Sequence, residues 1–404
     1  MRILITNTGP WGTGSAAVAE AVHHELRRLG HKAALLFPDS QFETSDRKRY
    51  YGRPDLYYIW RFPVERDGRV LATFPLMITD PHPRNVPKAP TFRDLSKDLF
   101  RFYLLEARRQ LEGAVKRFRP DLVECHHIWA TAYLAHQMGL PYVTVAHHSD
   151  QMGFQYDERM RSYAIEAARG ASWIFSISEF VKREVLALYP GVKEQKTVVL
   201  ENGYDQRIFF PRRCQRAQVF RSLRRADSPR LPLMTFAGKL SRTKGIDVLM
   251  RANQLVQRER KALLLLAGAG RLEDEFNVEE RAEFHWENVV FLGQVQQPLL
   301  AKLHNLATLS LMPSRTEGFG IAALEAMGCG TPVIATRSGG PETFVVGDLI
   351  QPEDPEALAG AILNLLSLKP REQRGLRQAA IQRARQYSWK EIVKRRLDYF
   401  NQMR

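Results

Sequence analysis

The stretch LSLMPSRTEGFGIAALEAMGCGTPVIAT, residues 309–336, decides the fold. An apolar run ends at Pro313, a helical pattern begins near Gly320 and stops at Gly330, and a second apolar run follows at 332–336. Runs that are apolar at every position are typical of strands covered on both faces, and such strands form parallel sheets. The stretch therefore predicts one strand–helix–strand unit of a doubly wound α/β sheet.

The same unit recurs along the whole chain of 404 residues. The apolar runs lie at 2–6, 32–37, 121–125, 142–146, 173–178 and 196–200 in the first half, and at 233–238, 262–268, 288–293, 309–313, 332–336 and 348–351 in the second. Two such series predict two Rossmann-like domains, at 1–203 and 204–385, with an insertion at about 38–100 in the first. Ser388 and Glu391 have capping-box spacing and predict a last helix over 386–404.

Composition narrows the classes of partner. The net charge is +15, so the surface attracts anions, but the basic residues are dispersed and carry no nucleic-acid-binding signature. We therefore expect no nucleic-acid partner. Cys125, Cys214 and Cys329 lack CxxC spacing. The apolar run in MRILITNTGPWG is too short for the h-region of a signal peptide, and the longest apolar stretch, ALLLLAGAG, is too short to cross a bilayer. These features predict a cytoplasmic protein.

The helix start at 317–325 has the features of an anion site. Gly318 and Gly320 leave room for a ligand at the free N–H groups of the helix. Glu317 and Glu325 flank that end, and carboxylates accept hydrogen bonds from sugar hydroxyls. A nucleoside-diphosphate sugar, with sugars on both sides of a diphosphate, suits this pattern. The glutamate pair alone is more typical of an ordinary α/β turn with surface glutamates, and it is the surrounding Pro-Ser, Gly-Phe-Gly and Glu-Ala-Met that favour the ligand site.

The stretch PSRTEGFGIAALEAMGCGTPVIATRSGG resembles the signature of the retaining, GT-B-fold glycosyltransferases of family 4, the group 1 type. FAGKLSRTKGIDVLMRA is similar to the segment of that family that places two cations on the diphosphate. Gly238, Lys239 and Lys244 fall on its positions. Lys239 stands where the family usually has Arg, so a point charge replaces the bidentate fork.

The first half resembles the family less closely. GTGSAAVAEAV is similar to the family's Gly-Gly loop and helix, with Gly14 on the second glycine and Thr13 in place of the first. YVTVAHHSD puts His147 at the histidine near the transferred sugar, and DLVECH puts His126 at a histidine on the acceptor side.

The resemblance implies a GT-B architecture, in which two doubly wound domains face a central cleft and the last helix crosses back to the first domain. The donor would bind the second domain and the acceptor the first. Glu325 would hold the ribose, Glu317 the transferred sugar, and the lysines with the Ile321 amide the diphosphate. The implied catalytic residues are Glu317, His147, Lys244 and Lys239, and the implied donor-binding residues are Gly238, Lys239, Lys244, Val295, Gly318, Phe319, Gly320, Ile321, Glu325 and Gly14.

The expected reaction is sugar transfer, with retention, to a carbohydrate, lipid-linked or small-molecule acceptor. A UDP-sugar is the expected donor in preference to a GDP-sugar, and no cofactor is expected. No metal is expected either, because neighbouring strand residues point to opposite faces, so each of the pairs 126–127 and 147–148 offers one histidine ligand at most.

Other interpretations stay open. A nucleotide-sugar epimerase or a glucan phosphorylase would keep the fold, and a basic non-catalytic binder of nucleic acid or anionic lipid would keep only the charge. Aromatic and basic residues at 38–120 also suggest peripheral contact with an anionic membrane, at its inner face. There FRDLSKDLFRFYLLEARRQL is either an amphipathic surface helix or a core-packing helix with a basic outer face.

Overall fold

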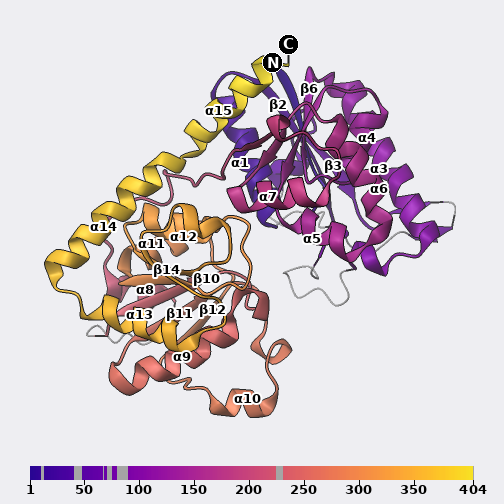
Figure 1. Cartoon of the computed structure of the whole chain (residues 1–404). Helices are drawn as coiled ribbons and strands as arrows, with labels where there is room; N and C mark the ends of the chain where they lie inside the picture. Colours follow the sequence, from indigo (N-terminus) through magenta and orange to yellow (C-terminus); the bar gives the residue numbers. More distant parts are fainter. Residues whose placement is uncertain are drawn as a thin grey trace. The chain divides into compact units, whose positions relative to one another are not determined.

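The computed structural model describes residues 1–10, 13–40, 48–66, 68–70, 75–79, 90–223 and 231–403. The chain divides into two compact units (Figure 1). The first unit comprises Met1–Glu201 and Trp389–Arg404, and the second comprises Asn202–Ser388. The cleft expected between the domains stays a prediction, and each unit is described by itself.

The first unit is built on a seven-stranded sheet in the order β3-β2-β1-β6-β7-β8-β9, in which neighbouring strands run parallel. Its strands are β1 (Arg2–Asn7), β2 (Lys32–Asp39), β3 (Tyr57–Arg61), β6 (Leu122–His126), β7 (Tyr142–Ala146), β8 (Ile174–Ser176) and β9 (Thr197–Val199), with a hairpin of β4 (Glu65–Arg66) and β5 (Arg69–Val70). Its helices are α1 (Gly14–Arg28), α2 (Lys48–Tyr51), α3 (Lys97–Phe118), α4 (Thr131–Gln137), α5 (Ser149–Tyr156), α6 (Glu158–Gly170), α7 (Glu179–Leu188) and α15 (Trp389–Asn401).

The segment expected as an insertion at about 38–100 is in part a piece of the sheet. Its strand β3 pairs in parallel with β2, from Leu35 opposite Tyr57 to Asp39 opposite Arg61. The sequence pattern did not predict this strand because it lies at the sheet edge, where buried and partly exposed residues alternate. Residues 41–47, 67, 71–74 and 80–89 of the segment lie outside the described part of the chain.

The second unit is built on a six-stranded parallel sheet in the order β12-β11-β10-β13-β14-β15. Its strands are β10 (Leu233–Ala237), β11 (Leu263–Ala267), β12 (Val289–Gly293), β13 (Leu309–Met312), β14 (Val333–Thr336) and β15 (Gly347–Ile350). Its helices are α8 (Arg216–Ser222), α9 (Ile246–Glu259), α10 (Val278–Glu283), α11 (Gln297–Leu306), α12 (Ile321–Gly328), α13 (Pro355–Ser367) and α14 (Pro370–Ala384). The expected strands of both halves are thus confirmed.

Both faces of the second sheet are covered, as its continuous apolar runs predict. Leu264 and Leu266 of β11 belong to a buried cluster that includes residues of α9 and α13. Leu263 and Leu265, which point the other way, pack with residues of α8 and α11. Figure 1 shows α9 and α13 apart from α11 and α12, across the strands of this sheet.

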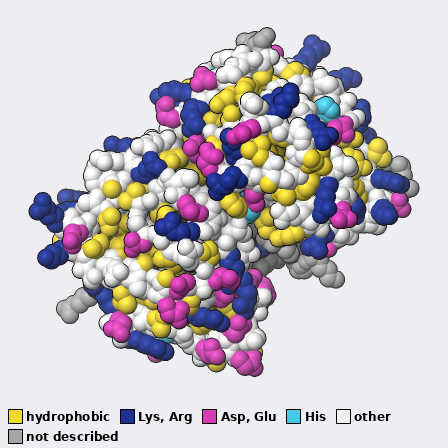
Figure 2. All heavy atoms as spheres, in the orientation of Figure 1, with side chains coloured by type: hydrophobic (Ala, Val, Ile, Leu, Met, Phe, Trp, Pro, Cys, Tyr) yellow, Lys and Arg dark blue, Asp and Glu magenta, His cyan; other side chains and the backbone are white. Residues whose placement is uncertain are grey.

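The surface carries its charge in a mixed pattern. On the face shown in Figure 2, Lys and Arg side chains are interspersed with Asp and Glu side chains. This dispersal does not resemble the single basic stripe of a nucleic-acid groove. Within the described part of the chain, no helix is long and apolar enough to cross a membrane.

Close backbone contact at the carboxyl edge of the second sheet gives a stability prediction. A Cβ on Gly268, just after β11, would lie 1.6 Å from the carbonyl oxygen of Gly238. We expect Gly268→Ala to lower the free energy of unfolding by about 1–3 kcal/mol, because the backbone must move to admit the methyl group. Urea denaturation of the purified variant measures this difference.

Gly375→Ala is the matched control. Gly375 is exposed in α14, and a Cβ there meets nothing within 4 Å. This change should raise the free energy of unfolding by about 0.5–1 kcal/mol, because alanine in a helix interior is more stable than glycine by that amount. Equal stability of the two alanine variants would contradict the close contact.

Candidate functional site

The two central strands of the second sheet place the candidate site. The chain lays down β10, β11 and β12 in one direction, and then returns to put β13 on the other side of β10. Ligands of open α/β sheets bind at the carboxyl ends of strands where the order reverses in this way. The loops that follow β10 and β13, residues 238–245 and 313–320, are therefore side by side at the switch point.

These two loops are in direct backbone contact. Gly245 has a φ of 69°, and a Cβ on it would lie 1.9 Å from the carbonyl oxygen of Pro313. The N–H of Arg315 donates a hydrogen bond of 2.9 Å to the carbonyl of Thr243. Glycine at position 245 thus allows the close approach that brings the side chains of both loops together.

The contact joins two of the predicted site residues. The Lys244 ammonium lies 2.7 Å from the Glu317 carboxylate, and the Ser314 hydroxyl lies 3.5 Å from the same oxygen. The Glu317 backbone is held as well, because its N–H donates to the Ser338 carbonyl at 3.0 Å and its carbonyl accepts from the Gly340 N–H at 2.9 Å. Loops after three neighbouring strands therefore fix one ion pair.

The start of α12 offers free donors beside this ion pair. Gly320, with a φ of 96°, precedes the helix, and no side chain caps it. Within the described residues, the N–H groups of Ile321 and Ala322 have no acceptor. Gly318 and Gly320 are buried. Such a helix end has the partial positive charge and the orphan donors that bind an anion.

Phe319 differs from the other residues of this stretch. Its ring is buried, with its centroid 4.8 Å from that of Phe344 and 6.1 Å from that of Tyr387. The side chain therefore packs in the core. A role of this residue in ligand binding would use its backbone.

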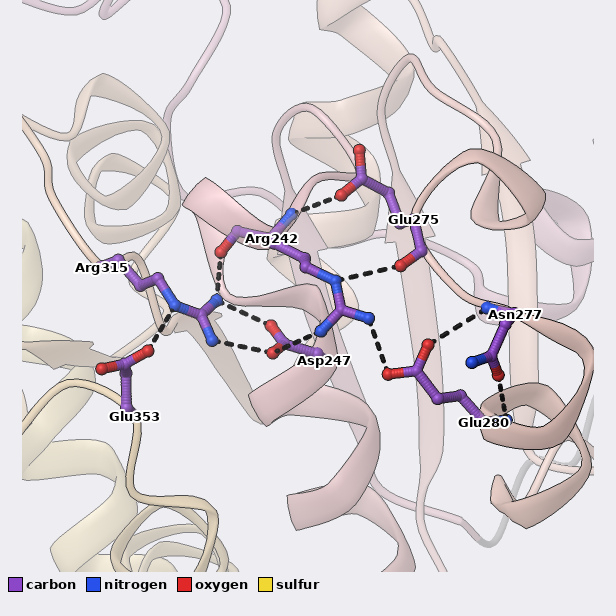
Figure 3. A network of polar contacts seen from close by, with 7 residues as sticks. All are labelled: Arg242, Asp247, Glu275, Asn277, Glu280, Arg315 and Glu353. Atoms are coloured by element: carbon purple, nitrogen blue, oxygen red, sulfur yellow. Dashed lines mark hydrogen bonds and ion pairs between the residues drawn. The ribbon is translucent and has the colours of Figure 1, made fainter.

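A network of arginines and carboxylates also ties the same loops together (Figure 3). Arg315 donates two hydrogen bonds of 2.8 Å to Asp247, and Arg242 lies 3.5 Å from the same carboxylate. Arg315 also pairs with Glu353 at 2.7 Å, and Arg242 pairs with Glu280 at 2.6 Å.

The network shows which cations of these loops are paired with carboxylates and which are not. Burial opposes the charge of Asp247, but hydrogen bonds and the charge of Arg315 outweigh burial and lower its pKa. Arg242 and Arg315 are thus held by carboxylates. Lys239, which follows β10 and is partly exposed, forms no ion pair or hydrogen bond among the described residues. The sequence pattern did not predict the role of Asp247, although it stands three residues after Lys244.

Glu325 lies one turn inside α12. Its residue is half-buried, and among the described side chains none donates a hydrogen bond to it. Burial raises its pKa to about 8, and the negative charge of Asp205 adds to the rise. At neutral pH a carboxyl group with this pKa is largely protonated, so it can accept a hydrogen bond from a ligand hydroxyl through its carbonyl oxygen and donate one through its O–H.

The carboxyl edge continues from Lys239 to Val295. The Gly238 N–H donates to the Ala267 carbonyl at 3.0 Å, and the Gly268 N–H donates to the Gly293 carbonyl at 2.8 Å. Val295 is partly exposed between β12 and α11. The predicted residues of the second half thus follow one edge of one sheet.

The predicted residues of the first half lie in the first unit. Gly14 is the exposed first residue of α1, and a Cβ on it would meet nothing within 4 Å, so this position does not require glycine. Thr13 caps the helix by accepting from the Ala16 N–H at 3.4 Å. His126 ends β6 and His147 follows β7, with 2.9 Å between His126 Nδ1 and His147 Nε2.

One expectation about these histidines is wrong. His126 and His127 were expected on opposite faces, but both rings lie 5.0 Å from the His147 ring, centroid to centroid. The reason is the φ of 81° at His127, which ends the extended conformation of β6. In the described part of the chain, no group of three or more His, Cys, Asp or Glu residues has the arrangement of a metal site.

Two family models match the chain. Residues 12–207 match the model described as Glycosyltransferase Family 4, and residues 232–368 match the model described as Glycosyl transferases group 1. The second match contains both loops of the candidate site.

Relatives extend the similarity. An uncharacterised glycosyltransferase of Methanocaldococcus jannaschii is 29% identical over 323 residues, which cover 74% of this chain and 79% of the relative. A D-inositol 3-phosphate glycosyltransferase of Thermomonospora curvata is 32% identical over 251 residues, or 58% of each chain. Among solved structures, Anabaena HepE in complex with UDP-glucose matches with a TM-score of 0.72 at 17% identity and covers 100% of both chains.

Glu325 predicts a pH dependence of stability. Its pKa is raised from 4.5 in the unfolded chain to about 8 in the folded protein, so the folded state binds the proton more tightly. The stabilisation is complete at low pH and is lost as the pH rises toward about 8. We expect Glu325→Gln to remove this fall from the free energy of unfolding, measured by urea denaturation between pH 5 and 8.5.

Glu372→Gln serves as the control, because Glu372 is exposed in α14. Its slope with pH should stay like that of the unchanged protein. The same slope in Glu325→Gln as in the unchanged protein would show that burial does not raise the pKa of the Glu325 carboxyl group.

Proposed function

This chain is a glycosyltransferase with the GT-B fold, and we propose that it takes its sugar from a nucleoside-diphosphate sugar held by the second unit. The observation that carries the proposal is the Lys244–Glu317 pair of 2.7 Å at the switch point between β10 and β13. A cation and a carboxylate held together there match a ligand that joins a diphosphate to a sugar.

The diphosphate would lie among the cations and helix N–H groups of these loops. The Lys239 ammonium group has no partner among the described residues, and the Lys244 ammonium group gives one of its three donors to Glu317 and keeps the others for a ligand. The N–H groups at Gly320 and Ile321 complete the set. As the bond from the sugar C1 to the phosphate oxygen breaks, the electron pair stays on that oxygen. Positive groups already fixed around that oxygen stabilise the growing charge, and in many enzymes such stabilisation supplies most of the rate enhancement. We propose that they make a divalent metal unnecessary.

The two glutamates would bind hydroxyl groups on either side of the diphosphate. Glu325, half-buried and unpaired among the described residues, would accept from the ribose. Glu317 would accept from the transferred sugar. The acceptor hydroxyl forms the new bond to C1, and its proton goes to the departing phosphate oxygen, with retention of configuration. His147 would support the sugar side of the oxocarbenium-like transition state.

Acceptor and base are proposed only as classes. The acceptor is a hydroxyl of a carbohydrate, a lipid-linked molecule or a small molecule, bound by the first unit. UDP is the proposed diphosphate, supported by the complex of HepE with UDP-glucose.

The donor proposal is tested by nucleotide release. Incubation with UDP-sugars and GDP-sugars in EDTA, followed by chromatography, should show release of UDP. Lys239→Ala and Lys244→Ala should each lower the rate by about tenfold or more, because a hydrogen bond to a charged group contributes about 1.5–3 kcal/mol.

Lys302→Ala, an exposed lysine of α11, is the control and should keep the full rate. Equal rates of UDP release for all three lysine variants would contradict the proposed role of Lys239 and Lys244 in binding the diphosphate. An epimerised sugar that stays attached to its nucleotide would point to an epimerase.

We also propose a peripheral contact with the anionic inner face of a membrane, through α3. Most apolar residues of this helix, Phe100 and Leu111 among them, are buried in the core, so the contact would be mainly electrostatic. Arg101 and Lys116 are exposed on its outer side, where Leu105 is 63% exposed. Each basic residue near an anionic surface contributes about 1 kcal/mol.

Flotation with vesicles of phosphatidylglycerol and phosphatidylcholine tests this contact. Arg101→Glu combined with Lys116→Glu should lower the bound fraction severalfold, and high salt should do the same. Lys302→Glu is the control. Binding to neutral vesicles, or equal binding of both variants, would contradict the proposal.

A further inference from the structure

A chain of buried polar groups runs through the first unit to His147. Arg396 of α15 donates a hydrogen bond of 2.6 Å to Glu124 Oε1 of β6. The same oxygen lies 3.0 Å from His126 Nε2, and His126 Nδ1 lies 2.9 Å from His147 Nε2. Arg396, Glu124 and His126 are 0% exposed. Arg396, 272 positions from Glu124 in the sequence, is thus linked through buried polar contacts to His147, the histidine proposed to act on the transferred sugar.

The charges along the chain determine where the protons are. Burial opposes the ionisation of Glu124, but the Arg396 charge and the His126 hydrogen bond outweigh it and lower the Glu124 pKa. An ionised carboxylate only accepts hydrogen bonds, so His126 must carry its proton on Nε2. Burial lowers the His126 pKa and keeps that ring neutral, which leaves Nδ1 as an acceptor.

The His126 tautomer in turn sets that of His147. An acceptor at His126 Nδ1 requires a donor at 2.9 Å, so His147 carries its proton on Nε2 and a lone pair on Nδ1. Burial lowers the His147 pKa well below its usual value, and His127, His126 and Arg396 add to this effect. The backbone around the ring is fixed too, because Asp150 accepts from the N–H groups of both His147, at 2.8 Å, and Ile128, at 2.9 Å.

We propose that Glu124 and Arg396 are positioning residues that fix His147 as a neutral ring with its Nδ1 lone pair available to a sugar hydroxyl. The inference rests on the proposed role of His147 in sugar transfer. A neutral ring suits that role, since a histidine cation would repel the positive charge that develops at the sugar C1. A carboxylate that orients a histidine through its other nitrogen is a recurring way to hold a tautomer.

The competing explanation is that Arg396 and Glu124 only attach α15 to the sheet. Paired removal of both charges distinguishes the two. Replacing a buried ion pair with apolar residues of similar volume is often neutral for stability, whereas removing one partner is not. Glu124→Leu combined with Arg396→Met should therefore fold, yet it takes the acceptor away from His126 Nε2.

The test reads the tautomer directly, from the ¹⁵N chemical shifts of labelled histidines. In the unchanged protein, His147 should show a protonated Nε2 and an unprotonated Nδ1. In the double variant, both signals should move toward an average of two tautomers. Turnover of the UDP-sugar should fall about 10–100-fold, as for other groups that orient an active-site histidine, with KM within about twofold.

His126→Phe is the second variant, because it leaves the Arg396–Glu124 pair in place and removes the ring that links Glu124 to His147. It should shift the His147 ¹⁵N signals toward an average of two tautomers and lower the turnover to the same extent as the double variant. Arg395→Met is the matched control from the same helix, since Arg395 pairs with Glu201 at 2.7 Å and does not touch His126. This variant should keep the ¹⁵N chemical shifts of His147 and the turnover of the unchanged protein.

Two results would overturn the inference. One is an Nδ1-protonated His147 in the unchanged protein, or the same tautomer in all variants. The other is an altered tautomer with full turnover, which would show that the reaction does not use it. Absence of any sugar transfer by the unchanged protein would instead refute the proposed function, and the chemical shifts would still decide the tautomer.

Discussion

The candidate site depends on one constraint, the reversal of strand order between β10 and β13. In a parallel sheet the loops at the carboxyl ends of neighbouring strands must meet, and the reversal leaves these two without a helix packed between them. Gly245 then lets the loops approach until a Cβ would lie 1.9 Å from the Pro313 carbonyl oxygen. Without this contact, Lys244 and Glu317, 73 residues apart, would have no reason to pair.

The distribution of charge at this edge explains why an anionic ligand would bind there. Asp247 and its neighbouring carboxylates hold Arg242 and Arg315, which stiffens the loops. Lys239 and the start of α12 keep free donors, within the described residues. The two arginines are used for structure, and the point charge of Lys239 is left for the ligand. Glu325 adds a carboxyl group whose pKa is raised to about 8 by burial and by the charge of Asp205.

The first unit handles charge in the opposite way, because burial opposes the charge of a cluster of three histidines. His126, His127 and His147 all have lowered pKa values, caused first by burial. One buried carboxylate, Glu124, is ionised among them because Arg396 reaches it from α15. The last helix of the chain is therefore part of the chemistry proposed for the first unit as well as of its core.

The sequence by itself determined the fold class, and it pointed to the second half of the candidate site. Continuous apolar runs predicted the parallel strands, and Gly318, Gly320 and the two glutamates predicted an anion site at the helix start. These features are local, because a strand pattern, a helix start and the spacing of glycines can each be recognised in a segment of about 30 residues. The edge strand β3 was not predicted, because a strand with alternating burial gives a weaker sequence pattern than a continuous apolar run.

Tertiary structure decided which side chains meet. No spacing relates Arg396 to Glu124, and nothing in the sequence shows that His127, with its φ of 81°, turns beside His147. Likewise only the packed loops show that Arg315 is held by Asp247 while Lys239 has no partner among the described residues. Pairing, burial and protonation depend on distances between residues remote in the chain, and those distances exist only after the sheet has formed.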